Sequence, residues 1–325
     1  MSNSPKSKMA RSALALVCCM IAGSGSAEEP KKSTADLREP VYRVTKQEPR
    51  VTPTTTAATS IVAPESRPAA AAAAANKSHP LDLPIQMAQK ALERSQAEIV
   101  DYTAILVKRE RVNGHLNDEA YYSAKIRNEK KSDGQITTPF SVYLKFLKPT
   151  SVKGREVNYV KGHNNGKLIA HEGGLRGKFT PSLYLDPNGT LAMMGQRYPI
   201  TEVGIERLCE KLLERANHDR VRSMCKVTTQ PAKINKRAAT RIEVVHPEKM
   251  SHLDFHLARV FIDDEYGVPV RYEAYDWPRK PGAPVTDNDL IEQFTYVRLK
   301  LNVGLTDRDF DHRNDAYLFN KSFDP

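Results

Sequence analysis

The hydrophobic positions of this chain change their period as the sequence proceeds. Between residues 82 and 99, apolar side chains return every three, four or seven residues, at Ile85, Ala88, Leu92 and Ile99. This spacing places them on one side of a helix, and Asp82 as N-cap with Pro84 in the first turn are typical of a helix start. The pattern therefore predicts that the folded part of the chain opens with an amphipathic helix.

After Asp101 the period becomes two, which indicates strands. Apolar and polar residues alternate over 105–108, and Asn113-Gly114 is a strong two-residue hairpin signal. Further strands are predicted at 121–127, 140–146, 157–160, 167–170, 226–229, 240–245, 257–262, 270–275 and 290–301, with a loop at 173–199 and a second helix over 205–213.

These elements predict one fold class. About nine or ten strands joined by short turns form an antiparallel sheet, because parallel strands need long crossover connections. We expect an α+β domain in which a strongly curved antiparallel sheet carries helices over its concave face.

The N-terminal residues have a different composition. Lys6, Lys8 and Arg11 precede the apolar stretch 13–22, and small residues follow, so residues 1–27 are predicted to be a secretory signal peptide. Residues 28–79 are rich in Pro, Ala and Thr without apolar periodicity, and are predicted to be a disordered spacer. Residues 80–325 form the single folded domain of this interpretation, which is exported to the periplasm or cell envelope.

Export changes how charge and cysteines are interpreted. The chain carries a formal charge of +10, of which about +5 belongs to residues 80–325. This mild excess fits either an anionic envelope surface or solubility alone, whereas nucleic acid is excluded as a partner by export and by the absence of a binding motif. Cys209 and Cys225 remain in the exported chain, and an oxidising compartment favours either a disulfide between them or two buried thiols.

Catalytic motifs are missing from the sequence. It contains no G-x-S-x-G elbow and no H-E-x-x-H helix, and no cofactor is implied. The richest polar cluster runs from His246 to Glu265, within which His252, Asp254 and His256 share one face if the segment is extended. Two histidines and a carboxylate are possible metal ligands, and the alternative is a hydrated loop that leads into a strand.

A curved sheet also has apolar positions that either fill a core or line a cavity. The candidates for a ligand cavity are Phe140, Val142, Leu144, Phe146, Val260, Ile262, Val270 and Tyr272, with Trp277 at its mouth. The pattern by itself does not separate a filled core from an open pocket.

Long stretches of the chain resemble a known family. Pro139–Val160, Leu168–Lys178, Leu191–Leu208, Phe261–Pro278 and Leu299–Asp311 are similar to a bacterial, planctomycete-type family, the domain of unknown function 1571. Lys148-Pro149 at a strand end, Ile262-Asp263-Asp264 before Gly267-Val268-Pro269, and Asn302, Leu305 and Asp309-Phe310 after a late strand more distantly resemble LolA/LolB-type periplasmic lipoprotein carriers. That resemblance implies a half β-barrel with an apolar concave face.

Three functional hypotheses follow. The first is a non-enzymatic carrier or sensor that binds lipid or acylated protein in the half-barrel. The second is an envelope hydrolase or metal-dependent enzyme that uses the His246–Glu265 cluster. The third is a structural or adaptor domain with a well-filled interior.

Overall fold

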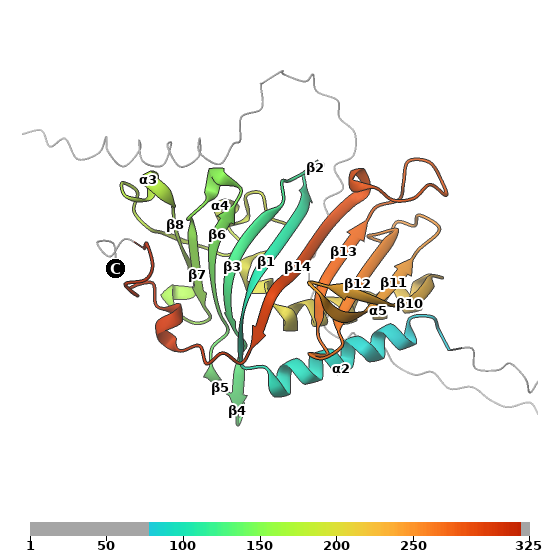
Figure 1. Ribbon diagram of the computed structural model, residues 1–325, viewed down its shortest axis with the longest axis horizontal. Helices are drawn as coiled ribbons and strands as arrows, with labels where there is room; N and C mark the ends of the chain where they lie inside the picture. Colours follow the sequence, from blue (N-terminus) through green and yellow to red (C-terminus); the bar gives the residue numbers. More distant parts are fainter. Residues whose placement is uncertain (1–77, 320–325) are drawn as a thin grey trace, which may run out of the picture. The chain divides into compact units, whose positions relative to one another are not determined.

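The computed structural model describes residues 78–319. The predicted signal peptide, and the predicted spacer up to residue 77, lie outside the described residues. Figure 1 shows the described part as one large sheet with two long helices, α2 (Asp82–Glu98) and α5 (Ile205–Arg222). None of the helices in residues 78–319 is long and apolar enough to cross a membrane.

The strands range from two to twelve residues in length. They are β1 (Asp101–Val112), β2 (His115–Leu116), β3 (Ala120–Arg127), β4 (Lys130–Ser132), β5 (Gln135–Thr138), β6 (Ser141–Lys148), β7 (Glu156–Val160), β8 (Leu168–His171), β9 (Leu183–Leu185), β10 (Lys226–Ile234), β11 (Arg237–Val245), β12 (Leu257–Asp263), β13 (Pro269–Tyr275) and β14 (Leu290–Leu301). Two short helices, α3 (Gly174–Gly177) and α4 (Thr190–Met193), lie in the segment predicted to be a loop.

Twelve of these strands form one antiparallel sheet. Its order is β10-β11-β12-β13-β14-β1-β3-β6-β7-β8-β9, with β2 paired to β1, while β4 and β5 form a separate hairpin. The first and last strands of the order are different strands at opposite edges, so the sheet does not close into a barrel. The long strand β14 lies beside β1, which brings the two ends of the domain together at the centre of the sheet.

The turns explain why neighbouring strands pair. Asn113 and Gly114 adopt φ values of 50° and 80°, as a type I′ hairpin requires, and Asn235 and Lys236 adopt 51° and 70° between β10 and β11. The hairpin predicted at Asn113-Gly114 is therefore confirmed.

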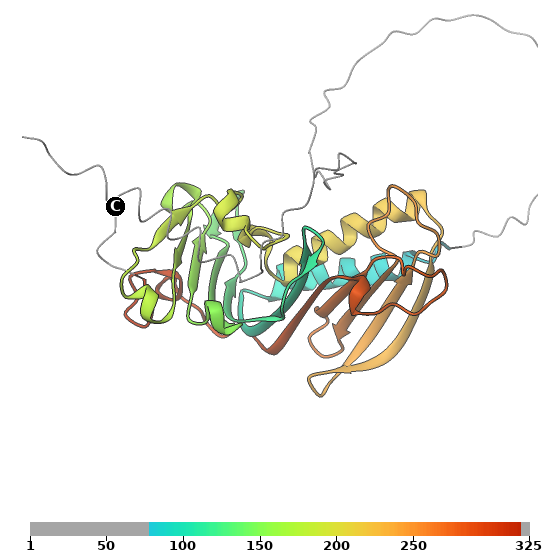
Figure 2. The ribbon, with the colours of Figure 1, turned by 90° about the horizontal axis from the view of Figure 1, so that it is seen from above.

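The main core lies between the concave face of the sheet and the two helices. Alternate residues of β1 and β3, among them Tyr102 and Ile126, point toward Ala91 of α2 and Cys209 of α5, and all of these are buried. Figure 2 shows the sheet bent around the side-by-side helices α2 and α5. The predicted α+β architecture, a strongly curved antiparallel sheet with helices on its concave face, is confirmed.

A second, smaller core lies on the opposite, convex face. Tyr143 of β6 and Ile169 of β8 are buried there beneath Phe310 and Phe319 of the C-terminal segment. This segment therefore covers the convex face of β6–β8, where the sheet would otherwise expose apolar side chains.

The structure contains two free thiols instead of the disulfide that the sequence raised. Cys209 and Cys225 are both buried and unpaired. The rise of α5 from Cys209 to Arg222 is about 20 Å, and the three residues that follow retrace at most about 11 Å, which exceeds the reach of a disulfide. Burial raises the pKa of Cys209 to about 12 and that of Cys225 to about 11, so both thiols stay protonated at neutral pH.

Candidate functional site

The proposed cavity residues in and just before β6 pack in or against the main core. Phe140, Val142 and Leu144 are 5 %, 0 % and 8 % exposed and pack in the main core with both long helices. Phe146 is half-buried, with its ring edge-on to Tyr122 at a centroid distance of 4.7 Å. Three of the four residues therefore lie in the main core, and Phe146 lies at its edge.

The other half of the concave face is less completely covered. Val260 of β12, Tyr272 of β13 and Phe294 of β14 are direct cross-strand neighbours, and all three are half-buried. The Tyr198 ring contacts Phe294 at a centroid distance of 6.3 Å. We call these four residues the apolar wall.

Two more of the proposed cavity residues lie on the same face as the apolar wall but are covered. Ile262 and Val270 are 9 % and 4 % exposed. They belong to strands β12 and β13, whose alternation gives them the same direction as Val260 and Tyr272.

A cluster of two buried carboxylates and two half-buried cations lies next to the apolar wall. Lys108 is the cross-strand neighbour of Phe294, and Glu110 is the neighbour of Glu292. The Lys108 Nζ lies 2.9 Å from Glu110 Oε2, and the Arg197 Nε lies 3.0 Å from Glu292 Oε2. Two carboxylates and two cations therefore share one place, and their formal charges cancel. We call these four residues the ion cluster.

Burial controls the protonation chemistry of the ion cluster. It raises the pKa of Glu292, although Arg197 and the Tyr198 hydroxyl oppose the rise. Burial alone would lower the pKa of Lys108, but Tyr122 and Glu110 favour its charged form and raise the pKa. Apart from its ion pair, neither carboxylate oxygen of Glu110 has a hydrogen-bond partner among residues 78–319.

A short segment that precedes α5 packs against the ion cluster. The Arg197 Nη1 donates to the Arg111 carbonyl at 3.2 Å, and the Asn117 side chain donates to the Gly195 carbonyl at 3.2 Å. The Gln196 side chain accepts a hydrogen bond from Lys108. Residues 195–198, which we call the strap, thus connect the β1–β3 end of the sheet to the apolar wall.

Sequence analysis missed the ion cluster and the strap. Residues 108–111 are all charged and lie inside a strand. Because successive side chains of a strand point to opposite faces, such a run places charges on both faces of the sheet. That run was the available signal. The partners Arg197 and Glu292 are far away in the sequence, so only the fold brings them together.

The predicted histidine cluster is organised by a residue outside it. Asp219 of α5 is buried, with Oδ2 lying 3.2 Å from His246 Nε2 and Oδ1 lying 3.0 Å from His218 Nδ1. The Ser223 hydroxyl lies 3.4 Å from His246 Nδ1. Ser223, His246 and Asp219 therefore lie side by side in the order of a catalytic triad. However, the Ser223 hydroxyl donates to the Asp219 carbonyl at 3.0 Å, and His246 is fully buried.

The metal site proposed at His252, Asp254 and His256 is not assembled. These residues belong to the connection before β12 and not to a strand, so they do not share a face. Asp254 pairs with Arg215, and His256 Nδ1 lies 2.8 Å from the His246 carbonyl. Within residues 78–319, no group of three or more His, Cys, Asp or Glu residues is placed to hold a metal ion.

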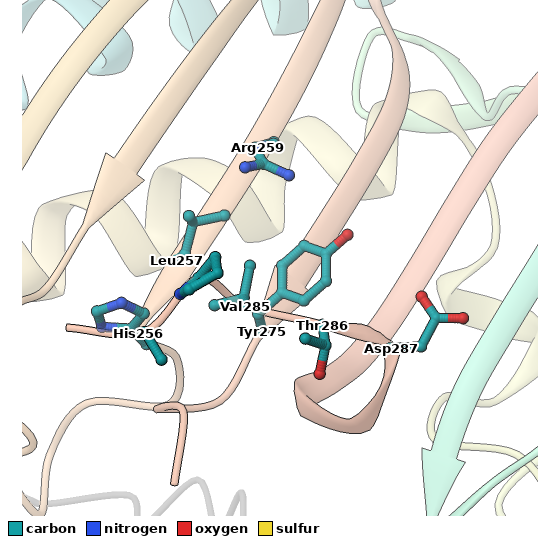
Figure 3. A pocket seen from close by; sticks show the side chains of 9 residues that line it. His256, Leu257, Arg259, Tyr275, Val285, Thr286 and Asp287 are labelled. Carbon is teal, nitrogen blue, oxygen red and sulfur yellow. The ribbon is translucent and has the colours of Figure 1, made fainter. Parts of the chain in front are cut away.

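A hollow of about 310 Å³ lies on the convex face (Figure 3). Leu257, Arg259 and Tyr275 form its floor, and the connection between β13 and β14 forms its wall with Val285 and Thr286. Its cation is already neutralised, because Arg259 pairs with Glu243 at 2.6 Å and Glu273 at 3.3 Å. The hollow therefore has an aromatic and aliphatic lining without a free charge in its floor.

Trp277 does not lie at the mouth of the concave face. Its ring contacts His256 at a centroid distance of 5.9 Å, and the Lys249 Nζ lies 5.1 Å from its centroid. Both partners belong to the connection between β11 and β12, so Trp277 packs at one end of the sheet.

A search of curated proteins found no match. A solved DUF1329 family protein from Desulfovibrio piger is 11 % identical, with 72 % of this chain and 98 % of that chain covered and a TM-score of 0.34. A LolA superfamily protein from Nitrosomonas europaea is 11 % identical (69 % and 97 % covered, TM-score 0.28), and LprF from Mycobacterium bovis is 11 % identical (70 % and 97 % covered, TM-score 0.36).

One comparison covers most of the domain by sequence. Residues 99–319 match the model of a family described as a protein of unknown function, DUF1571. The match begins at the end of α2 and includes the apolar wall, the ion cluster and the strap. It confirms the family that the long sequence stretches indicated: the chain belongs to the DUF1571 family.

Proposed function

We propose that this protein is an exported, non-enzymatic binding protein of the periplasm or cell envelope that carries or senses lipid or acylated protein. The observation that supports it is the unequal cover of the concave face. Phe140, Val142 and Leu144 are buried in the main core, whereas Val260, Tyr272 and Phe294 form an apolar row that is only half-buried.

The chemistry of the apolar wall suits an alkyl chain. Each methylene removed from water contributes about 0.8 kcal/mol, so one long acyl chain binds usefully without a catalytic group. The ion cluster lies at the end of the wall, and the Glu110 carboxylate there, which apart from its ion pair lacks hydrogen-bond partners among residues 78–319, is an acceptor for an amide or amine beside the chain. Entry of a chain displaces the strap, because Tyr198 covers Phe294 in this structure.

The test compares two tyrosines of one strand. Tyr272 and Tyr275 are both half-buried in β13, but Tyr272 belongs to the apolar wall and Tyr275 lines the convex hollow. Displacement of a fluorescent fatty acid is measured for wild type, Tyr272→Gln and Tyr275→Gln, beside native mass spectrometry of protein purified from cell envelopes. We expect Tyr272→Gln to weaken probe binding about tenfold, since apolar contact area is lost, and Tyr275→Gln to bind as wild type does.

The reverse result overturns the proposal. If only Tyr275→Gln weakens the probe, the binding site is the convex hollow. If wild type binds no probe and emerges empty from envelopes, the structural or adaptor hypothesis remains.

A further inference from the structure

The connection between β8 and β9 presents two large apolar side chains to solvent. Leu175 is 76 % exposed and Phe179 is 85 % exposed. The Lys178 amide donates to the Leu175 carbonyl at 3.3 Å, so the chain makes a tight turn between the two residues. We call this pair the apolar tip. Leu175 belongs to α3, which Figure 1 shows at the same end of the sheet as the β6–β7 connection.

The connection that carries the apolar tip is tightly built. At its base, the Ser182 hydroxyl lies 3.2 Å from His171 Nδ1, and both residues are buried. A Cβ on Gly173 would lie 2.3 Å from the Lys153 carbonyl oxygen, and one on Gly177 would lie 2.1 Å from the Glu172 carbonyl oxygen. Only glycine fits at these two close approaches, so the backbone packing itself holds Leu175 and Phe179 outward.

The charge around the apolar tip is positive. The carbonyl of Lys153 lies against Gly173. Both Lys153 and Lys178 are exposed, and neither has a carboxylate partner in the described part of the chain. The nearby acid Glu172 is neutralised by Arg155 at 2.8 Å. Two exposed lysines therefore belong to the segments that carry or adjoin the apolar tip.

We propose that the apolar tip is a membrane-surface contact that inserts Leu175 and Phe179 into the interface of an anionic phospholipid bilayer, with Lys153 and Lys178 on the lipid phosphates. A bilayer fits better than a protein partner, because a stable protein interface needs about 800 Å² of complementary surface on each side. A protruding pair of side chains supplies far less, whereas a lipid interface adapts to any apolar tip and attracts lysines electrostatically.

The experiment uses the mature chain and vesicles of phosphatidylcholine with or without phosphatidylglycerol. Cosedimentation is measured for wild type, for Leu175→Ser with Phe179→Ser, and for Lys153→Gln with Lys178→Gln. The matched control is Val221→Ser with Met224→Ser, because these two side chains are equally exposed, at 78 % and 77 %, but lie at the end of α5. A Phe179→Trp variant in a Trp277→Phe background reports insertion by its emission.

We expect wild type to bind only the anionic vesicles, more weakly as salt increases. The serine pair at the apolar tip should weaken binding about tenfold or more, the glutamine pair should remove the preference for phosphatidylglycerol, and the control pair should change neither. The tip tryptophan should shift its emission to the blue with anionic vesicles.

Two results overturn the proposal. Vesicle binding that survives the serine pair, or falls equally with the control pair, places the contact elsewhere. Absence of vesicle binding and of the emission shift leaves a protein as the occupant of the tip. Fatty-acid displacement at the apolar wall is independent of all these outcomes.

Discussion

At the scale of single residues, the most constrained group is the buried carboxylate of Asp219. Burial alone would raise its pKa, but hydrogen bonds with His246 and His218 and the charge of Arg215 hold the pKa below its ordinary value. A carboxyl with a lowered pKa in the folded state stabilises the fold above its unfolded pKa. That stabilisation is lost as the pH falls through the lowered folded value.

Replacement of Asp219 by Asn tests this role. We expect Asp219→Asn to reduce the free energy of unfolding by about 2–3 kcal/mol at pH 7, because the buried His246 loses a charged partner. The difference in unfolding free energy from wild type should narrow as the pH falls below the ordinary pKa of an aspartate, about 4, and through the lower pKa of folded Asp219. Urea unfolding across this pH range measures the difference in unfolding free energy between Asp219→Asn and wild type. A difference that stays constant with pH contradicts the lowered pKa of Asp219.

At the scale of elements, α5 begins without a side-chain cap of its own. Its N-cap is Gly204, whose φ of 131° suits only glycine. The Ile205 amide instead donates to the Tyr102 hydroxyl of β1 at 2.8 Å, and both residues are 0 % exposed. The start of α5 is therefore set by a strand that precedes it by about a hundred residues.

Removal of the Tyr102 hydroxyl tests this connection. Tyr102→Phe should lower the free energy of unfolding by about 1–3 kcal/mol, because the buried Ile205 amide loses its acceptor. Tyr159→Phe is the matched control, since Tyr159 is also buried in the main core but its hydroxyl has no hydrogen-bond partner among residues 78–319. Equal losses for the two variants in urea unfolding would show that the contact with α5 is unimportant.

At the scale of the whole molecule, the C-terminal segment ties the convex face to the start of the sheet. Asp101, at the beginning of β1, accepts the backbone amides of Val303, Gly304 and Leu305 at 2.8, 3.2 and 3.0 Å. Farther along, the Tyr317 ring stacks on Tyr143 of β6 with centroids 4.1 Å apart. The segment thus acts as a cover for β6–β8.

The cover should contribute to global stability. Tyr317→Ala is expected to lower the free energy of unfolding by about 2–4 kcal/mol, since a stacked, half-buried ring and its hydrogen bonds are lost. The neighbouring Leu318 is 51 % exposed, so Leu318→Ala should change stability by less than about 0.5 kcal/mol. If Tyr317→Ala and wild type unfold at similar urea concentrations, the C-terminal segment does not stabilise the fold by covering β6–β8.

Local patterns determined much of the fold. The helical spacing over 82–99 and 205–213, the alternation in the strands and the Asn113-Gly114 turn each act over a few residues, and all are found in the structure. Short strands such as β4 and β9 were missed, because three residues carry too little pattern to identify them.

The site depended on contacts that no local pattern contains. From its own sequence the chain determined an antiparallel α+β sheet with helices, the family, and which positions are apolar. Tertiary structure alone decided that Val142 is sealed core while Tyr272 is half-covered, that Arg197 meets Glu292, and that Cys209 and Cys225 stay apart. The reason is physical: alternation assigns a side chain to a face of a sheet, but what covers that face arrives from elements distant in the sequence.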